Sequence, residues 1–221
     1  VYLSRYKVVS ELTVDRRSAY HRHTFKSAKD KHVVMNLSRT NSVRPGNAQW
    51  TFRQIDDTSF CGSQNGMFFY AVANQRVTGT RTVSNAREQF TVIDFADGAK
   101  TVELKIGFSY TSTDKARLNM QTEIEGKSFD QVRAHADKTW DEVLSKVRVS
   151  GGTELQKQLF YSGLYRVMQN PNLRSDVDVD QHATVYSSNN YWDTYANKLV
   201  ILQMLCLLYT SDAADDLIGV D

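Results

Sequence analysis

Short runs of alternating polar and apolar positions fill the first 122 residues, which is the pattern of β-strands that bury one face. The runs are rich in β-branched and aromatic residues, and turn-forming clusters such as RPGN at 44–47 and ADG at 96–98 separate them. Many short strands without intervening helices favour an antiparallel β-sandwich. The strands are expected at residues 1–3, 6–14, 20–25, 32–37, 50–55, 66–72, 89–95 and 101–110.

The hydrophobic period changes from two residues to 3.6 residues after Gly126. Ser128 and Gln131 have the spacing of a capping box, so they predict the start of a helix that ends before the glycine pair at 151 and 152. One face of this helix is apolar at positions 129, 132, 136, 140, 143, 144 and 147.

A second helix is expected to begin after Thr153, which forms another capping box with Gln156, and to stop at Asn170-Pro171. The polar, irregular segment 172–190 follows, and a third helix is expected from about Trp192 to Leu205. The chain is therefore expected to divide into an antiparallel β-sandwich domain (1–125), a linking helix (126–150) and the start of a helical domain (151–205).

Residues 206–221 do not continue this pattern. The run CLLYTSDAAD at 206–215 is the translation of TGTCTCTTATACACATCTGACGCTGCCGAC, which resembles a widely used transposase sequencing adaptor codon for codon. We therefore expect the tail to be a read-through from a metagenomic assembly and leave it out of the fold prediction. The chain also starts at Val1 rather than at methionine, and we interpret it as a fragment of a longer protein.

Charge and cysteine content narrow the possible functions. The net charge is +2, or +6 without the four aspartates of the tail, and the basic residues are spread along the chain. This distribution gives no signal for nucleic-acid binding. No apolar run is long enough to span a bilayer. Cys61 is the one cysteine outside the tail, so this part of the chain has no pair for an internal disulfide.

An aspartate run at positions 176, 178 and 180 has the spacing of a calcium loop. An EF-hand would need glycine at its sixth position and a carboxylate at its twelfth, and the chain has Gln181 and Ser187 there. We therefore interpret the run as a solvated loop, in which one aspartate could still face a substrate.

Two histidines, His21 and His23, share one face of a predicted strand. Their spacing suits a metal, but metal sites usually need three or four ligands and no third ligand is evident. A surface or interdomain strand is the better interpretation. Ser109 and Ser162 lack the sequence context of a catalytic nucleophile.

Trp192-Asp193 is the sharper signal. An indole ring offers a flat apolar plate to the C–H face of a pyranose, and a neighbouring carboxylate can accept hydrogen bonds from two sugar hydroxyls. The pair therefore suggests a sugar-binding site. Taken alone it is also compatible with a core tryptophan followed by an aspartate that caps a helix.

Five segments together resemble glycoside hydrolase family 92, the exo-acting α-mannosidases, and they follow the order of that family. The resemblance covers nearly all of residues 1–205, and its most specific pieces are LFYSGLYRVMQNPN and WDTY. The segments are Glu11–Phe25, Val102–Glu123, Phe129–Val149, Leu159–Asn172 and Trp192–Tyr195.

The resemblance implies a β-sandwich, linking helices and a catalytic α/α toroid, and therefore the first helices of that toroid in this chain. It also implies calcium-dependent, inverting hydrolysis of terminal α-mannosides on a mannose-containing glycan, by a secreted or periplasmic enzyme. A glutamate acid and an aspartate base would act on opposite sides of the sugar ring. In the family these residues lie further downstream, so no catalytic residue and no metal ligand is assigned here, and the chain itself is expected to be inactive.

Two departures from the family pattern leave the substrate linkage open: Ala196 replaces a frequent arginine, and the loop 175–188 is short. Two alternatives also remain, a non-catalytic carbohydrate-binding β-sandwich protein and another toroid enzyme such as a phosphorylase or a debranching-type glycosidase.

Overall fold

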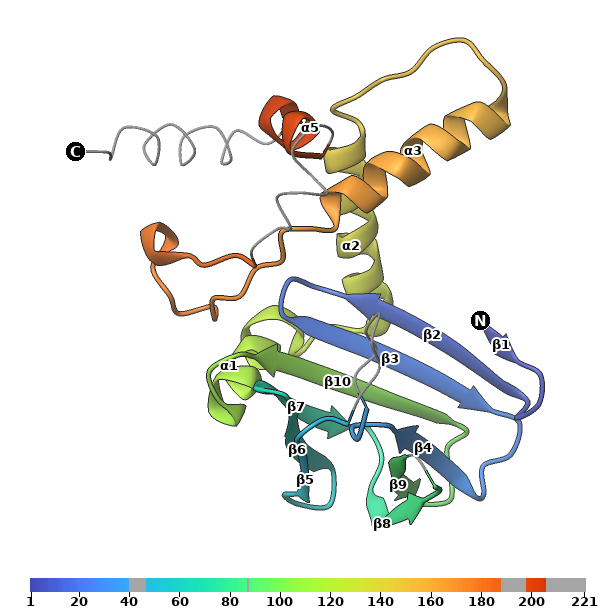
Figure 1. Cartoon of the computed structure of the whole chain (residues 1–221). Coiled ribbons are helices and arrows are strands. Elements are labelled where there is room, and N and C mark those ends of the chain that lie inside the picture. Colours follow the sequence, from blue (N-terminus) through green and yellow to red (C-terminus); the bar gives the residue numbers. More distant parts are fainter. Residues whose placement is uncertain (40–46, 87, 188–197, 206–221) are drawn as a thin grey trace. The chain divides into compact units, whose positions relative to one another are not determined.

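A computed structural model describes residues 1–39, 47–86, 88–187 and 198–205 (Figure 1). The chain divides into two compact units. The first, the sandwich unit, comprises Val1–Ala136 and Arg174–Thr184, and the second, the helical unit, comprises Asp137–Leu173 and the described residues after Thr184. The chain therefore passes from the sandwich unit to the helical unit, returns for eleven residues, and leaves again.

Ten antiparallel strands lie in the described part of the sandwich unit. Seven form one sheet in the order β1-β2-β3-β10-β7-β6-β5, and three form a second sheet in the order β4-β9-β8. The strands are β1 (Tyr2–Leu3), β2 (Val8–Val14), β3 (Ser18–Phe25), β4 (Lys31–Met35), β5 (Trp50–Gln54), β6 (Ser59–Gln64), β7 (Met67–Ala73), β8 (Val77–Ser84), β9 (Gln89–Phe95) and β10 (Thr101–Ser109).

The main core lies between the two sheets. Alternate residues of the central strands point into it, so that β7 contributes Phe69 and Ala71, β10 contributes Val102 and Leu104, and β9 contributes Ile93. Ile93 and Val102 have no exposed surface. This arrangement confirms the predicted antiparallel β-sandwich.

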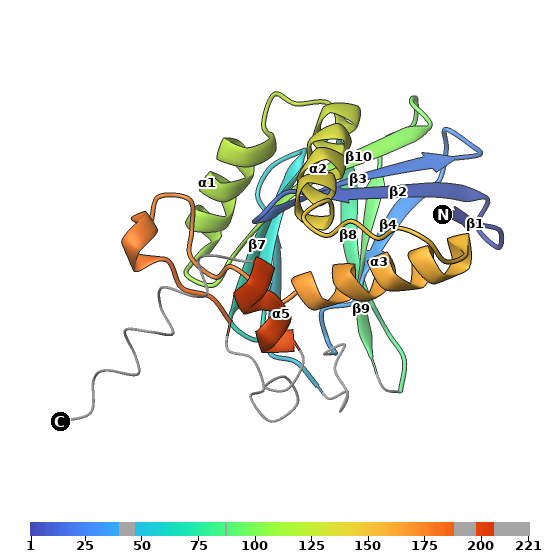
Figure 2. The same ribbon diagram turned by 90° about the horizontal axis from the view of Figure 1, so that it is seen from above.

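Helix α1 (Thr113–Ile124) covers the opposite face of the larger sheet, alongside β7 and β10 (Figures 1 and 2). Tyr70 of β7 packs there with Ala116, Met120 and Ile124 of the helix. Gly107 of β10 allows the close approach, because a Cβ atom at this position would lie 1.9 Å from the carbonyl oxygen of Ala116. The central strands β7 and β10 of the larger sheet are thus covered on both faces.

The prediction that the first 122 residues are all strands is wrong at α1. The helix has apolar residues at positions 116, 120 and 124, which share one narrow stripe, and its remaining positions are mostly polar. So weak a stripe does not stand out from the alternating pattern before it. The strands β6 and β8 were also missed, since β6 is buried over four consecutive residues and β8 is exposed along most of its length. The other eight strands begin and end within two residues of the expected bounds.

Helices follow the sandwich, as predicted. They are α2 (Phe129–Leu144), α3 (Glu154–Met168), the short 3-10 helix η1 (Gln181–Ala183) and α5 (Lys198–Leu205). Both expected capping boxes form, since Ser128 and Thr153 each exchange hydrogen bonds with the glutamine three residues later. Among the described residues, no helix is long and apolar enough to cross a membrane.

Candidate functional site

The predicted sugar-binding residues, Trp192 and Asp193, lie outside the described residues. The structure does describe the segment that leads to them, from the end of α3 to Ser187. This segment forms a loop whose two ends belong to the helical unit and whose middle, Arg174–Thr184, belongs to the sandwich unit. We call its two ends the neck and its middle the tip.

Backbone contacts close the neck. Leu173 and Tyr186 form a single antiparallel bridge. The amide of Ser187 donates to the carbonyl oxygen of Asn172 at 2.8 Å, and the Ser187 hydroxyl accepts from the amide of Asn172 at 2.8 Å. Residues 172 and 187 are therefore held side by side.

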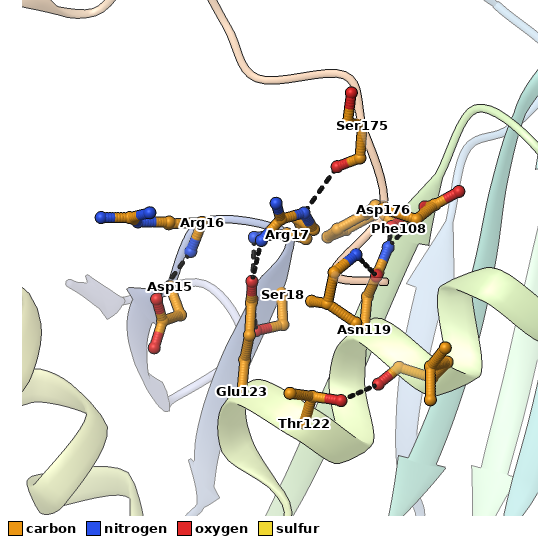
Figure 3. A network of polar contacts seen from close by, with 12 residues as sticks. Asp15, Arg16, Arg17, Ser18, Phe108, Asn119, Thr122, Glu123, Ser175 and Asp176 are labelled. Carbon is orange, nitrogen blue, oxygen red and sulfur yellow. Dashed lines mark hydrogen bonds and ion pairs between the residues drawn. The ribbon is translucent and has the colours of Figure 1, made fainter. Parts of the chain in front are cut away.

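The tip is held by Asn119 of α1, which has no exposed surface (Figure 3). Its side-chain amide donates to the carbonyl oxygen of Phe108 at 2.7 Å and to a carboxylate oxygen of Asp176 at 2.8 Å. Its side-chain oxygen accepts from the amide of Val177 at 3.0 Å. An asparagine side chain suits this place because it carries both donors and an acceptor.

A second contact runs through Glu123, one turn further along α1 (Figure 3). Its carboxylate accepts from the backbone amide of Arg17 at 2.8 Å, from the Arg17 guanidinium at 3.0 Å and from the Ser18 hydroxyl at 2.7 Å. The Arg17 Nε atom in turn donates to the carbonyl oxygen of Ser175 at 2.6 Å. The turn between β2 and β3, the end of α1 and the tip are therefore joined in one network.

The aspartate run is explained by these contacts. Asp176 binds Asn119, and Asp180 caps η1 by accepting from the amide of His182 at 2.8 Å. Asp178 forms an exposed ion pair with Lys115, and this contact lowers the pKa of Asp178 and raises that of Lys115. The described residues contain no group of three or more histidine, cysteine, aspartate or glutamate side chains that could hold a metal ion.

His21 and His23 lie half-buried on β3, with their ring centroids 5.8 Å apart. His23 Nδ1 is 2.9 Å from the hydroxyl oxygen of Ser10. Burial lowers the pKa of His21 to about 4, with a further contribution from His23, and burial also lowers the pKa of His23. The pair is thus a packed, neutral feature of the larger sheet.

Two family models match the chain, the glycosyl hydrolase family 92 N-terminal domain over residues 1–150 and the glycosyl hydrolase family 92 catalytic domain over residues 115–219. The chain belongs to glycoside hydrolase family 92. The resemblance inferred from the sequence is therefore confirmed. The second match enters the segment 206–221, whose adaptor origin stays a prediction.

Solved family 92 structures share the fold. The α-mannosidase BT3965 from Bacteroides thetaiotaomicron is 22% identical with a TM-score of 0.78, over 91% of this chain and 32% of that chain. The complex of the same enzyme with mannoimidazole is 22% identical with a TM-score of 0.77, over 91% of this chain and 31% of that chain. The inverting mannosidase BT2199 from Bacteroides thetaiotaomicron VPI-5482 is 18% identical with a TM-score of 0.72, over 89% of this chain and 30% of that chain.

A curated protein also matches, an uncharacterized secreted glycosidase from Arthroderma benhamiae (strain ATCC MYA-4681 / CBS 112371). It is 30% identical over 80 residues, which are 34% of this chain and 10% of that protein. The chain thus spans about a third of the mannosidase structures and a tenth of this relative.

Sequence reasoning missed the residues that hold the tip. Asn119, Glu123 and Arg17 were not identified, because the helix that carries two of them was itself missed. A signal was present, since an asparagine inside a helix is unfavourable and needs a compensating contact.

Proposed function

We propose that this chain is part of a longer glycosidase that removes terminal α-mannosyl residues from a mannose-containing glycan. The observation that carries the proposal is the succession of the two family 92 domain matches along one chain. The fold likeness to mannosidases supports it. The catalytic-domain match favours an enzyme over a stand-alone binding module.

The proposed reaction inverts the configuration of the sugar. One carboxylic acid protonates the leaving oxygen while a carboxylate on the opposite side activates a water molecule, and the two groups stand apart to admit that water. We place neither group in this chain. We therefore propose that the 221-residue chain alone does not hydrolyse mannosides. Turnover of an activated aryl α-mannoside by the pure chain, with calcium present, would refute this.

A calcium ion is implied by the family but does not fit the described residues. They contain no cluster of three ligating side chains, and each aspartate of the run at 176–180 already has a structural partner. We propose that calcium, if the longer enzyme uses it, is bound by residues outside this described set.

We further propose that Trp192 and Asp193 bind the terminal mannose. The indole would lie against the C–H face of the ring, and the carboxylate would accept hydrogen bonds from two hydroxyls. Support comes from the chemistry of the pair and from the family to which the WDTY segment belongs. We also propose a secreted or periplasmic location because the chain belongs to this family, and the match to a secreted glycosidase supports it.

The test is the Asp193→Asn variant of the full-length enzyme, because asparagine keeps the shape and any capping ability of the residue. Loss of a charge-assisted hydrogen bond of about 1.5–3 kcal/mol should lower kcat/KM roughly 10- to 150-fold if the bond forms in the transition state. An effect within about twofold, with a small change in stability, would mean that Asp193 only caps a helix. Trp192→Ala needs a separate folding control, since it removes packing as well as stacking.

A further inference from the structure

The outer edge of β2 is open along its second half. β1 runs beside the start of β2 (Figure 1). The last pair of this ladder joins Val1 and Ser10: the Val1 amino group donates to the carbonyl oxygen of Ser10, and the Ser10 amide donates to that of Val1, both at 2.8 Å. Backbone groups along a strand face its two neighbours alternately, so those of Leu12 and Val14 point to the same side as those of Ser10. No described strand pairs with Leu12 and Val14 on that side.

A groove of about 550 Å3 lies beside this open edge, and we call it the edge groove. Val1, Leu3 and Leu12 line it from the two strands, and Phe129 and Arg133 line it from α2. All of these residues belong to the sandwich unit. The edge groove is therefore a feature of one compact unit, with backbone groups on one side and apolar side chains around it.

The exposed side chains at this edge are apolar. Leu12 is 62% exposed and Val14 is 52% exposed. Native edge strands usually carry charged residues, a proline or a bulge, which oppose pairing with another strand. β5 lies at the other edge of the sheet and follows this rule, since its exposed residues are Thr51 and Arg53. The end of β2 is instead typical of a strand that has a neighbour on each side.

The charges in the edge groove indicate what such a neighbour would carry. Glu11 also lines the groove, but the guanidinium of Arg22 binds its carboxylate at 2.8 and 3.0 Å. Arg133 forms no ion pair within the described part of the chain. A strand with a carboxylate on the side of α2 would therefore gain a charge-assisted hydrogen bond from Arg133.

We propose that the edge groove receives one further β-strand, which runs antiparallel to β2, pairs with Leu12 and Val14, and belongs to the part of the longer glycosidase outside this chain. The inference rests on the proposed function in one point, that the chain is part of a longer enzyme. It extends the larger sheet along β2 and makes the sandwich unit depend on that other part for its full stability.

The short length of the open edge favours the same polypeptide over a separate partner. Pairing along Leu12–Val14 alone would be marginal for a free peptide or a second copy, because association costs translational and rotational freedom. A tethered strand avoids most of this cost, since its effective concentration is high. The chain covers 32% of a mannosidase structure that shares its fold, so an enzyme of that size has polypeptide to supply the strand.

The first experiment measures amide hydrogen exchange at single residues of β2, in the 221-residue chain and in the full-length enzyme. The amides of Glu11 and Thr13 face β3 and serve as internal controls, which should be protected in both proteins. The amides of Leu12 and Val14 should exchange rapidly in the 221-residue chain. In the full-length enzyme they should exchange at least about 100-fold more slowly, because the added strand accepts their hydrogen bonds.

The second experiment compares the melting temperatures of Leu12→Lys and Val34→Lys. Val34 is 55% exposed on β4 of the sandwich unit and does not line the edge groove, so it is the matched control. A lysine at an edge position opposes strand pairing. Leu12→Lys should therefore lower the melting temperature of the full-length enzyme by several degrees and leave that of the 221-residue chain within about 1 °C. Val34→Lys should leave both within about 1 °C.

The outcomes separate this proposal from the proposed function. Equally fast exchange of Leu12 and Val14 in the two proteins overturns the added strand, as does an equal effect of the two lysine substitutions on the full-length enzyme. Protection that depends on enzyme concentration, or on an added protein, assigns the strand to another chain and also overturns the proposal. A full-length enzyme that does not cleave an aryl α-mannoside refutes the proposed function, while the exchange experiment still decides whether the edge is covered.

Discussion

The sandwich unit and the helical unit bury their apolar residues to different degrees. In the sandwich unit, central residues such as Ile93, Val102 and Leu104 are at most 2% exposed. In the helical unit, Leu155 and Leu159 of α3 are each 64% exposed, and Phe160 is 41% exposed. Of the described helical-unit residues, Leu164 and Leu202 are the hydrophobic ones that are buried.

The difference follows from the architecture of each unit. The central strands of the larger sheet lie between the second sheet and α1, so their apolar side chains are buried, whereas edge residues such as Leu12 stay exposed. A helix buries one stripe, and α3 carries apolar residues beyond the stripe that its described neighbours cover. An exposed apolar surface of this kind commonly marks a place where other elements or partners pack. The sandwich unit is therefore expected to set the stability of the described chain.

The largest expected difference is between two leucine-to-alanine substitutions, one in each unit. Leu104→Ala in the sandwich core should lower the free energy of unfolding by about 2–5 kcal/mol, because it removes buried methyl groups and leaves a cavity. Leu159→Ala on α3 should change it by less than about 0.5 kcal/mol, since the side chain is already exposed. Urea unfolding followed by circular dichroism measures both. Equal losses of stability in the two variants would show that Leu159 is buried in solution, and would contradict the proposed difference in burial between the two units.

Two glutamates extend the comparison to ion pairs. Glu123 is 9% exposed and accepts three hydrogen bonds, whereas Glu142 is 66% exposed and pairs with Lys138 on α2. Glu123→Gln should cost about 2–3 kcal/mol, because part of the network loses its acceptor in a buried place. Glu142→Gln should cost less than about 0.5 kcal/mol. A loss at Glu142 as large as that at Glu123 would contradict this account.

The same difference explains how much the sequence could predict. Strong alternation along β10 predicted its position closely, because Val102, Leu104 and Ile106 face the core between the sheets. The buried run of β6, the exposed strand β8 and the polar helix α1 carry no such signal, since tertiary contacts determine them. The pairing of Asn119 with Asp176 joins residues 57 positions apart in the chain, and local spacing cannot show it. The family resemblance, by contrast, depended on residue identity and was visible in full.

A fall in pH should distinguish the units, because all five histidines lie within Val1–Ala136 or Arg174–Thr184. Burial keeps His21 neutral to a pKa of about 4, whereas an unfolded histidine has a pKa near 6.5. Between these values the unfolded state binds more protons, so stability falls as pH falls through this window. A loss of about 1.8 kcal/mol is expected from His21 between pH 7 and pH 5.

The control for this prediction is His135, which is 57% exposed. His21→Gln should flatten the pH dependence of urea unfolding between pH 7 and pH 5, and His135→Gln should leave most of it in place. If the pH dependence of the free energy of unfolding is unchanged in His21→Gln, groups other than His21 cause it.

The smallest expected effect concerns two helix caps, one chosen from each unit. The Ser112 hydroxyl accepts from the amide of Lys115 at 3.2 Å at the start of α1, and Thr153 forms the capping box of α3. Removing either hydroxyl should destabilise its own helix by about 1 kcal/mol. Because α1 is packed on the larger sheet, Ser112→Ala should shift the unfolding transition of the sandwich unit by this amount. Thr153→Ala should instead raise amide exchange in the first turn of α3 and leave that transition in place. An equal shift from both substitutions would mean that the two units unfold together, and the separate stability assigned to the sandwich would have to be given up.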